Sequence, residues 1–507
     1  MGGPDNDDQK AEGAVERIVG WFDSRLGLSH ELLRPAPRYS INPFYWLGAL
    51  AVVAFVIQGI TGSIMLLYYV PTPATAYAST LYIFQNVSYG QFLETIHLYT
   101  AYAMIMLAFM HMMRGYFVSV HKKPREIMWV TGMLMGFVTL GFGFTGYLLP
   151  WSVVSYSATN VGTSMISILP PPVASFINFL VKGTGGDSGE LLRFFDLHVV
   201  VLPAVLLVLL GVKMYMLEAH GVSEPPTGET PDPQTKRGRT IPFFPDVSFY
   251  LLELAALFGA AMLLVSVLFP LNLPPAYSPA AAGQYVAQPD WYFLWIYQIL
   301  KISSFEKAGL SWALSFVTLI FVILVLLPFI DRGETKRIAR RPIYVTLGLV
   351  FVAEVIVLAI WGHLTPGQVI PNTQAIEVLG GTAVLVSLIS LTAYRILPGI
   401  TFENAQLPSV PSPSQSRGSS PHKASVWASG MFVLVLGAGA LSIGSSINSL
   451  VLMATFGLTE AQLVILTFSL VVLAASVAGA CFLLYRLDLG RGRIKRRVRA
   501  FEVGWKE

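Results

Sequence analysis

Residues 197–215, LHVVVLPAVLLVLLGVKMY, form an apolar run long enough to cross a membrane as a helix. His198 lies near the start of this run, and Lys213 follows fifteen residues later, near its end. A lysine inside a membrane span is costly, so such a residue either extends to the membrane surface or serves a function. The stretch predicts a membrane-spanning helix with polar side chains at two depths, and it raises the question of what Lys213 does there.

The composition places the whole chain in the membrane class. Of its 507 residues, 54% are hydrophobic and only 12% are charged, which is well below the charged content of soluble globular domains. The net charge of +4 comes mostly from basic residues beside the apolar runs, so it does not indicate a nucleic-acid partner. Cys481 is the single cysteine, which excludes disulfides, cysteine-based metal sites and a c-type haem held by two thioethers. We expect an all-α polytopic membrane protein.

Basic residues cluster after the second, fourth, sixth and tenth predicted spans. These segments all lie on the same side of the membrane. Because loops rich in Lys and Arg stay on the cytoplasmic side, both termini are expected on that side, here called the n side, opposite the p side. The expected location is the cytoplasmic membrane of a prokaryote. The ten predicted spans are 44–70, 93–119, 127–149, 194–218, 246–270, 309–330, 342–363, 375–397, 427–449 and 461–486.

Two polar linkers rich in proline, 219–245 and 403–424, divide these spans into groups of four, four and two. Before the first group, residues 21–34 are amphipathic and predict a helix that lies on the membrane surface. The predicted domains are an n-side tail over 1–40, a four-span unit over 41–222, a second four-span unit over 223–402, the linker 403–424 and a two-span extension over 425–507.

Histidines recur at a fixed spacing within the first four spans. His97 and His111 are fourteen residues apart on the second span, which is close to four helical turns, so both point the same way about 21 Å apart. His198 and Lys213 are fifteen residues apart on the fourth span, which runs in the same direction. Two facing side chains at each of two depths are what two stacked haems with axial ligands require.

Glycines on the other two spans share this spacing. Gly48 and Gly62 are fourteen residues apart on the first span, as are Gly132 and Gly146 on the third. A flat macrocycle between helices needs side chains to be missing where it meets a backbone. Taken singly, the histidines could relay protons, the glycines could pack helices and the lysine could reach the surface. The period shared by four helices favours a four-helix bundle that binds two haems.

At this point the residues resemble a known family. The stretches ETIHLYTAYAMIMLAFMHMMRGYF (94–117) and GFTGYLLPWSVVSYSA (143–158) resemble cytochrome b of the cytochrome bc and bf complexes, especially the chloroplast type. From 243 to about 363 the chain resembles subunit IV of the bf complex, with QPDWYFLWIYQILK (288–301) carrying the match. The last 110 or so residues have no counterpart in this resemblance.

The resemblance implies a quinol:cytochrome c or plastocyanin oxidoreductase. Quinol would be oxidised near the p side, with one electron passing to a Rieske iron–sulfur protein and the other crossing the membrane through two b haems. The chain has no iron–sulfur ligands of its own, so the Rieske centre would belong to another chain. The expected partners are that Rieske protein, a c-type cytochrome or equivalent acceptor, quinone and membrane lipids, in a homodimeric complex.

By this resemblance His97 and His198 ligate the p-side haem, and His111 and the residue at 213 ligate the n-side haem. The family has histidine where this chain has Lys213, and the preceding residue, Val212, cannot ligate. Two answers to the opening question stay open. Lys213 is a neutral amine ligand, or it extends to the surface beside a haem propionate and leaves the n-side haem five-coordinate or absent.

Other positions also depart from the family pattern. The chloroplast type attaches an extra haem through a cysteine where this chain has Trp46, so no covalent haem is expected. Glu94 stands where the family often has an arginine near a propionate, whereas Arg114 matches an n-side propionate partner. Glu218, His220 or Arg114 is expected to bind quinone on the n side.

The motif PDWY, residues 289–292, is expected to form the quinol oxidation site. The family usually has Pro-Glu-Trp-Tyr, and its acid accepts a proton from quinol, so Asp290 would take that role through a side chain one methylene shorter. The simpler interpretation of Asp290 is an N-cap of a short helix. Pro289, Trp291, Tyr292 and Tyr147 would line the pocket, and residues 151–165 would form its short surface helix.

Three function classes follow from these patterns. The leading hypothesis is a cytochrome b that sends the two electrons of quinol along separate paths. A di-haem anchor of a membrane dehydrogenase is the alternative, but such an anchor has no use for PDWY. A transporter without haem, with Lys213 in its substrate path, is the third, and it predicts no Soret absorbance.

Overall fold

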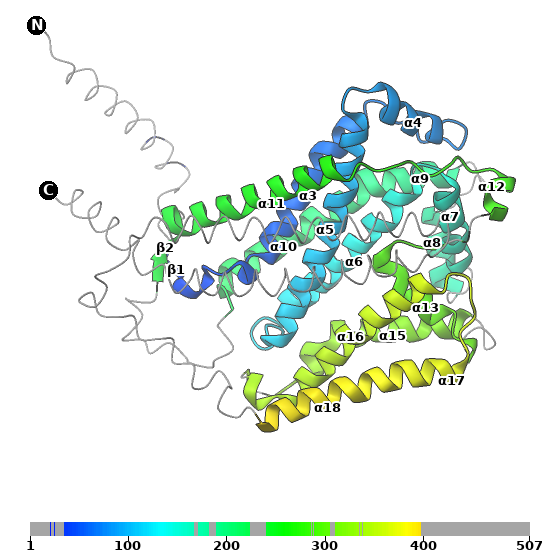
Figure 1. Cartoon of the computed structure of the whole chain (residues 1–507). Coiled ribbons are helices and arrows are strands. Elements are labelled where there is room, and N and C mark those ends of the chain that lie inside the picture. Colours follow the sequence, from blue (N-terminus) through cyan, green and yellow to red (C-terminus); the bar gives the residue numbers. More distant parts are fainter. Residues whose placement is uncertain are drawn as a thin grey trace, which may run out of the picture.

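The computed structural model is built almost entirely from long helices (Figure 1). It describes residues 35–396, except 167–170, 182–188, 224–239, 285, 287, 305–309, 334 and 337, together with Trp21 and Arg25. Most of the predicted surface helix 21–34, the linker 403–424 and the last two predicted spans lie outside the described residues.

Eight helices in the described part of the chain are long and apolar enough to cross a membrane. They coincide with the first eight predicted spans and confirm an all-α multi-pass membrane protein. Two of the eight are compound, because α9 continues through η4 into α10, and α17 continues through η9 into α18. Their bounds are α3 Leu47–Met65, α5 Gly90–Phe117, α6 Glu126–Leu148, α9 Glu190–Asp196, η4 Leu197–Val201, α10 Leu202–His220, α11 Ser248–Leu268, α15 Leu310–Ile330, α16 Pro342–Leu364, α17 Asn372–Ala375, η9 Ile376–Gly380 and α18 Gly381–Ile396.

Short elements cover the two ends of these helices. Figure 1 shows α4, α7, α8 and α12 gathered at one end and the two-stranded sheet at the other. In that sheet Pro35 lies opposite Pro242 in antiparallel register. The short elements are β1 Pro35–Pro37, η1 Arg38–Ser40, η2 Pro43–Tyr45, α4 Ala76–Asn86, α7 Val153–Ile166, α8 Pro171–Val181, β2 Thr240–Pro242, η6 Phe243–Val247, α12 Pro279–Gln284, η7 Trp291–Phe293, α13 Leu294–Leu300 and η8 Ile338–Arg340.

The first four spanning helices pack around an apolar centre. Ala54 of α3, Met104 of α5 and Leu206 of α10 form a buried cluster, against which Phe142 of α6 packs. The opposite faces of these helices are also apolar, and Leu207 is more than half exposed. A helix that is apolar all round is typical of a membrane span, where lipid covers the outer face.

A widened helical turn carries His198. Pro203 has no N–H group, and its ring clashes with the carbonyl four residues earlier in a regular helix. The chain accommodates Pro203 by forming the π-helical segment η4, in which the N–H of Leu202 donates to the carbonyl of Leu197. Such widened turns frequently occur at functional sites.

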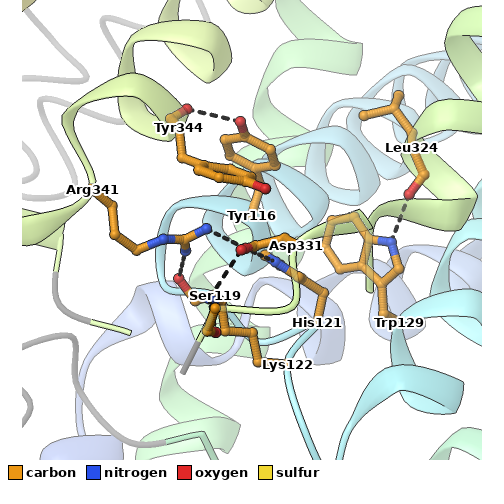
Figure 2. Close-up of polar contacts among 10 residues, drawn as sticks. Tyr116, Ser119, His121, Lys122, Trp129, Leu324, Asp331, Arg341 and Tyr344 are labelled. Carbon is orange, nitrogen blue, oxygen red and sulfur yellow. Dashed lines mark hydrogen bonds and ion pairs between the residues drawn. The ribbon is translucent and has the colours of Figure 1, made fainter. Parts of the chain in front are cut away.

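A buried ionic cluster joins the loop after α5 to the loop after α15 (Figure 2). Asp331 accepts a hydrogen bond from Nε2 of His121 at 2.8 Å, and its Oδ1 lies 3.1 Å from Nζ of Lys122. Arg341 pairs with the same carboxylate and also donates to Ser119. The cluster therefore connects segments more than 200 residues apart in the sequence.

Burial alone would raise the pKa of the Asp331 carboxyl. Hydrogen bonds from His121 and Lys122 and the charge of Arg341 have the larger effect, so the pKa lies below its ordinary value. For His121, burial lowers the pKa, although the hydrogen bond to Asp331 opposes this effect. Both groups therefore favour their high-pH forms in the folded protein, a carboxylate and a neutral imidazole.

Replacing Asp331 with asparagine is expected to destabilise the protein by about 3–5 kcal/mol, because it leaves two buried cations without their counter-charge. The measurement is the thermal unfolding midpoint of the solubilised protein. Arg332→Gln, on an exposed neighbour, serves as the matched control. An unfolding midpoint for Asp331→Asn equal to that of the control would show that the cluster adds no stability.

Acidification is also expected to destabilise the protein through His121. A neutral native imidazole contributes stability that is lost as pH falls below the ordinary histidine value of 6.5. His121→Gln keeps a side-chain N–H donor toward Asp331 but cannot titrate, so its unfolding midpoint should fall less between pH 7.5 and pH 5.5, an interval of about two units around the ordinary pKa. Equal pH dependence in both proteins would exclude His121 as the source.

Candidate functional site

Helices α5 and α10, with η4, place two pairs of polar side chains at two depths of the bundle. In the first pair, the rings of His97 and His198 face each other with centroids 6.5 Å apart and planes at 62°. Metal–imidazole bonds are about 2 Å long, so two nitrogens that share one ion lie about 4 Å apart. Each ring centroid lies about 1 Å behind its nitrogen, so the gap between His97 and His198 fits one metal ion with two axial imidazoles.

Two threonines determine which nitrogen each of these rings presents. Thr61 Oγ1 lies 2.8 Å from Nδ1 of His97, and Thr145 Oγ1 lies 3.0 Å from Nδ1 of His198. Each threonine donates its own hydroxyl proton to a carbonyl of its own helix, at 2.7 and 2.8 Å, so each hydroxyl oxygen accepts from Nδ1–H. The lone pairs of both Nε2 atoms are therefore free for a ligand in the gap.

Glycines make room for both histidines of the first pair. A Cβ atom at Gly62 would lie 3.4 Å from Cε1 of His97, and one at Gly146 would lie 2.7 Å from Cε1 of His198. Any side chain at Gly146 would displace the ring.

The second pair repeats this arrangement with a different side chain. A Cβ atom at Gly48 would lie 3.1 Å from Cε1 of His111, and one at Gly132 would lie 2.9 Å from Nζ of Lys213. The Lys213 amine therefore takes the position against its glycine that an imidazole takes in the other three cases. The four glycines found by their spacing each contact one of the four predicted ligand side chains.

Lys213 points into the bundle while its neighbours point outward. Val212 and Met214 are 44% and 53% exposed, whereas Lys213 is largely enclosed. Within the described part of the chain, Lys213 has no ion pair and no hydrogen-bond partner. Nδ1 of His111 is likewise buried without a partner in that part. Unlike the first pair, the second pair is not oriented by a threonine.

The two pairs of side chains suit a cofactor whose own atoms supply most of the ligands of its metal ion. No group of three or more His, Cys, Asp or Glu side chains in the described part of the chain could hold a bare metal ion. A haem requires only one or two axial ligands from the protein, and both pairs supply two.

A separate polar cluster surrounds Asp290. Tyr102 of α5 donates a hydrogen bond to Oδ1 of Asp290 at 3.1 Å, and Tyr292 donates to Oδ2 at 3.2 Å. Asp290 stands at the N-cap position of η7, yet its side chain makes no capping hydrogen bond there. Burial raises the pKa of the Asp290 carboxyl, and the hydrogen bonds from both tyrosines partly offset that effect.

Aromatic side chains enclose this carboxyl group. The ring of Trp291 meets the rings of Tyr102 and Tyr292 edge-on at 6.2 and 5.5 Å. Tyr292 packs directly on α6, where a Cβ atom at Gly143 would lie 2.9 Å from its hydroxyl. Tyr147 of α6 is close enough to interact electrostatically with Tyr102 and Tyr292. The structure therefore brings Asp290, Tyr292, Trp291 and Tyr147 together.

The chain before PDWY packs against the short helix α7. The N–H of Val153 donates to the carbonyl of Pro275 at 3.0 Å, and the rings of Tyr156 and Tyr277 stack at 3.6 Å. Pro289, next to Asp290, is partly buried. Helix α7, at residues 153–166, agrees with the short helix expected at 151–165.

The residues predicted on the n side lie at the opposite end of the bundle. Arg114 stacks over the ring of Tyr45 at 3.9 Å and donates to Ser223. Glu218 and His220, at the end of α10, are exposed. None of the three lines the open groove of about 360 Å³ between α3 and α11, whose lining includes Trp46 and Ser248. Glu94 lies on α5, one turn before His97, and is partly buried.

Sequence reasoning missed Tyr102, Thr61 and Thr145. For the threonines a signal was present, because each directly precedes a glycine of the repeated spacing, at 61–62 and 145–146. Tyr102 had no such signal, since its partner is 188 residues away.

Comparisons with known proteins identify two matching family models. The family model described as cytochrome b/b6/petB matches residues 34–221, and the model described as cytochrome b(C-terminal)/b6/petD matches residues 282–379.

Individual relatives match over longer stretches. The cytochrome bc complex cytochrome b subunit of Chlorobaculum thiosulfatiphilum is 34% identical over 346 residues, which cover 67% of this chain and 79% of that protein. Cytochrome b of Sulfolobus acidocaldarius is 31% identical over 409 residues, covering 75% of this chain and 71% of that protein.

A solved structure described as hyperthermophilic respiratory Complex III has a chain that superimposes with a TM-score of 0.61 at 26% identity. The match covers 76% of the present chain and 98% of that chain. With both family models matched in chain order and two relatives above 30% identity, this chain belongs to the cytochrome b family and is a cytochrome b subunit of a bc- or bf-type quinol oxidoreductase.

Proposed function

We propose that this chain oxidises quinol near the p side and passes electrons across the membrane through two b haems, in a quinol:cytochrome c oxidoreductase that translocates protons. The observation that carries the proposal is the contact of four glycines with four potential axial ligands at two depths. The hydrogen bond from Tyr102 to Asp290 supports a quinol site near His97, because Tyr102 follows His97 by five residues on α5.

In this proposal His97 and His198 would hold the p-side haem through their Nε2 atoms, and His111 and Lys213 would hold the n-side haem. The haems would supply reversible one-electron transfer. Thr61 and Thr145 fix the orientation and tautomer of the p-side ligands by accepting from Nδ1–H. Gly48, Gly62, Gly132 and Gly146 leave space for these side chains and for the macrocycles.

Lys213 acts as an amine ligand in its neutral form, because a protonated ammonium has no lone pair to offer. The position of Nζ supports this role over extension to the membrane surface, since the atom lies against Gly132 in the interior of the bundle.

Asp290 acts as the first acceptor of a proton from quinol, because quinol must release two protons as its two electrons leave. Each carboxylate oxygen receives one tyrosine hydrogen bond and keeps a second lone pair for a quinol hydroxyl. Tyr292, Trp291, Pro289 and Tyr147 form the wall of this site. The di-haem anchor alternative is not favoured, because an anchor needs no such proton acceptor.

The partners in this proposal are a Rieske iron–sulfur protein, a c-type cytochrome or equivalent acceptor, and a second copy of the chain. A relative named as part of a cytochrome bc complex and a neighbour named as Complex III support such an assembly. Both termini lie on the cytoplasmic side of a prokaryotic membrane, and quinone on that side meets Arg114, Glu218 or His220. The domain boundaries at 41–222, 223–402, 403–424 and 425–507 belong to the same proposal.

Lys213→Ala is expected to reduce the haem content from two b haems per chain to one, or to change the axial ligation of the n-side haem. The pyridine haemochrome assay counts the haems, and near-infrared magnetic circular dichroism reports the ligand type. Lys213→His should restore two haems with imidazole ligation, and Tyr215→Ala, on a side chain 74% exposed, is the matched control.

Haem content and spectra in Lys213→Ala identical to those of the wild type would exclude Lys213 as a ligand. One haem per wild-type chain would mean that the n-side site is not filled, and the proposed electron path across the membrane would then fail.

Asp290→Asn is expected to slow quinol oxidation roughly 10²- to 10⁴-fold, the usual contribution of a general base, with both haems retained. Stopped-flow reduction of the b haems by a quinol analogue measures this rate. Because burial raises the pKa of Asp290 and the base must be deprotonated, the wild-type rate should fall on the acidic side at a pH above the ordinary aspartate range. Asp290→Glu is the control that keeps the acid.

Turnover in Asp290→Asn at the wild-type rate would refute the role of this carboxyl as the proton acceptor.

A further inference from the structure

The structure raises the question of how an aspartate performs a task for which this family usually has a glutamate. Asp290 is one methylene shorter, and its backbone is fixed at the start of η7. Because the side chain does not cap that turn, its orientation must come from other contacts. Those contacts are the two tyrosine hydroxyls, one on each carboxylate oxygen.

The two tyrosines differ in what they can do for Asp290. Tyr292 is only two residues away on the same turn, so it moves with the carboxylate. Tyr102 comes from α5, a 28-residue helix that also carries His97 and His111. Its hydroxyl therefore ties the acid to a rigid element outside the PDWY segment.

The ring of Tyr102 is itself held in place. It contacts Trp291 at 6.2 Å and 80°, Tyr292 at 6.1 Å and 59°, and Tyr99 at 6.5 Å and 46°. An aromatic ring packed on three sides gives its hydroxyl a defined position.

We infer that Tyr102 is a positioning residue for quinol oxidation, whose hydroxyl holds the shortened acid Asp290 in register with the helix that carries His97. This inference rests on the proposed role of Asp290. It adds a residue from the second span to a site that the sequence analysis placed on PDWY, Tyr147 and the short helix expected at 151–165.

The hydrogen bond also affects the charge state of the acid. A donor to a carboxylate stabilises the charged form, so the Tyr102 hydroxyl opposes the effect of burial on the pKa of Asp290. The other titratable groups at this site are Tyr292 of η7 and Tyr147 of α6. Loss of the Tyr102 hydroxyl should therefore leave Asp290 protonated up to a higher pH.

The test is Tyr102→Phe in the full complex, which keeps the ring and removes only the hydroxyl. Stopped-flow reduction of the b haems by a short-chain quinol analogue is recorded from acidic to alkaline pH. We expect a roughly tenfold slower rate near neutral pH, as for the loss of one hydrogen bond to a charged group. We also expect the acidic limb to move up by about one pH unit and the rate to recover at alkaline pH.

A direct readout of the acid separates positioning from general damage. Infrared difference spectra on pH titration give a protonated-carboxyl band for Asp290, identified by its loss in Asp290→Asn. The band should persist to a higher pH in Tyr102→Phe. The matched control is Tyr99→Phe, one turn earlier on α5, which loses the hydrogen bond to Phe269 and should leave the profile of Asp290 unchanged.

Two double variants test whether the Tyr102 hydroxyl acts through Asp290. Asp290→Glu combined with Tyr102→Phe should recover most of the rate, because the longer side chain depends less on the Tyr102 hydroxyl. Asp290→Asn combined with Tyr102→Phe should be no slower than Asp290→Asn alone, because the hydroxyl would act only through the acid.

The outcomes distinguish this inference from the function on which it rests. If Asp290→Asn turns over at the wild-type rate, the proposed proton acceptor fails, and the inference about Tyr102 fails with it. If Asp290→Asn is slow but Tyr102→Phe keeps the wild-type rate, pH profile and infrared band, only the positioning role is overturned. Equal slowing by Tyr99→Phe and Tyr102→Phe, without a pH shift in either, would also overturn it.

Discussion

The bundle depends on the close approach of four side chains to four glycines. At one depth the rings of His97 and His198 lie where Gly62 and Gly146 leave room for them, and Cβ atoms there would come within 3.4 and 2.7 Å. At the other depth His111 and Lys213 meet Gly48 and Gly132 in the same way. Two of the contacts join α3 to α5, and the other two join α6 to η4 and α10, so they fix the position of α3 relative to α5 and that of α6 relative to α10. Larger residues at the glycines would push the helices apart and close the space between the paired side chains.

The two depths differ in how firmly their side chains are oriented. Each histidine of the first pair donates Nδ1–H to a threonine whose own proton is already committed to a helix carbonyl, so both tautomer and ring plane are set. In the second pair, Nδ1 of His111 is buried without a partner among the described residues. A lysine amine has no tautomer and needs no such partner, because its flexible stem brings Nζ to the required position. This difference gives a physical reason why the unusual residue occurs at the depth without threonine partners.

The sequence predicted features that depend on residues close together in the chain. It did not predict contacts between side chains that are far apart in the chain. Eight of the ten predicted spans coincide with helices of the described residues, because a membrane requires long apolar helices, and the fixed helical rise converts residue spacing into depth. The glycine positions followed from the same periodicity. Tyr102 was missed because nothing near it in the sequence indicates Asp290, 188 residues away. The cluster of His121, Lys122 and Asp331 was missed for the same reason, since a basic loop on the n side is already explained by membrane orientation.

Helix α5 links the two halves of the proposed chemistry. His97 and Tyr102 are five residues apart on this helix, about 7.5 Å along its axis. Quinol oxidation releases protons and electrons from one molecule, and their acceptors must be close to it but separate from each other. In the proposed function, a helix that presents His97 toward η4 and a hydroxyl toward Asp290 meets both conditions with one rigid element. Displacing α5 would then disturb the electron acceptor and the proton acceptor together, whereas a change confined to the PDWY segment would disturb only the proton acceptor.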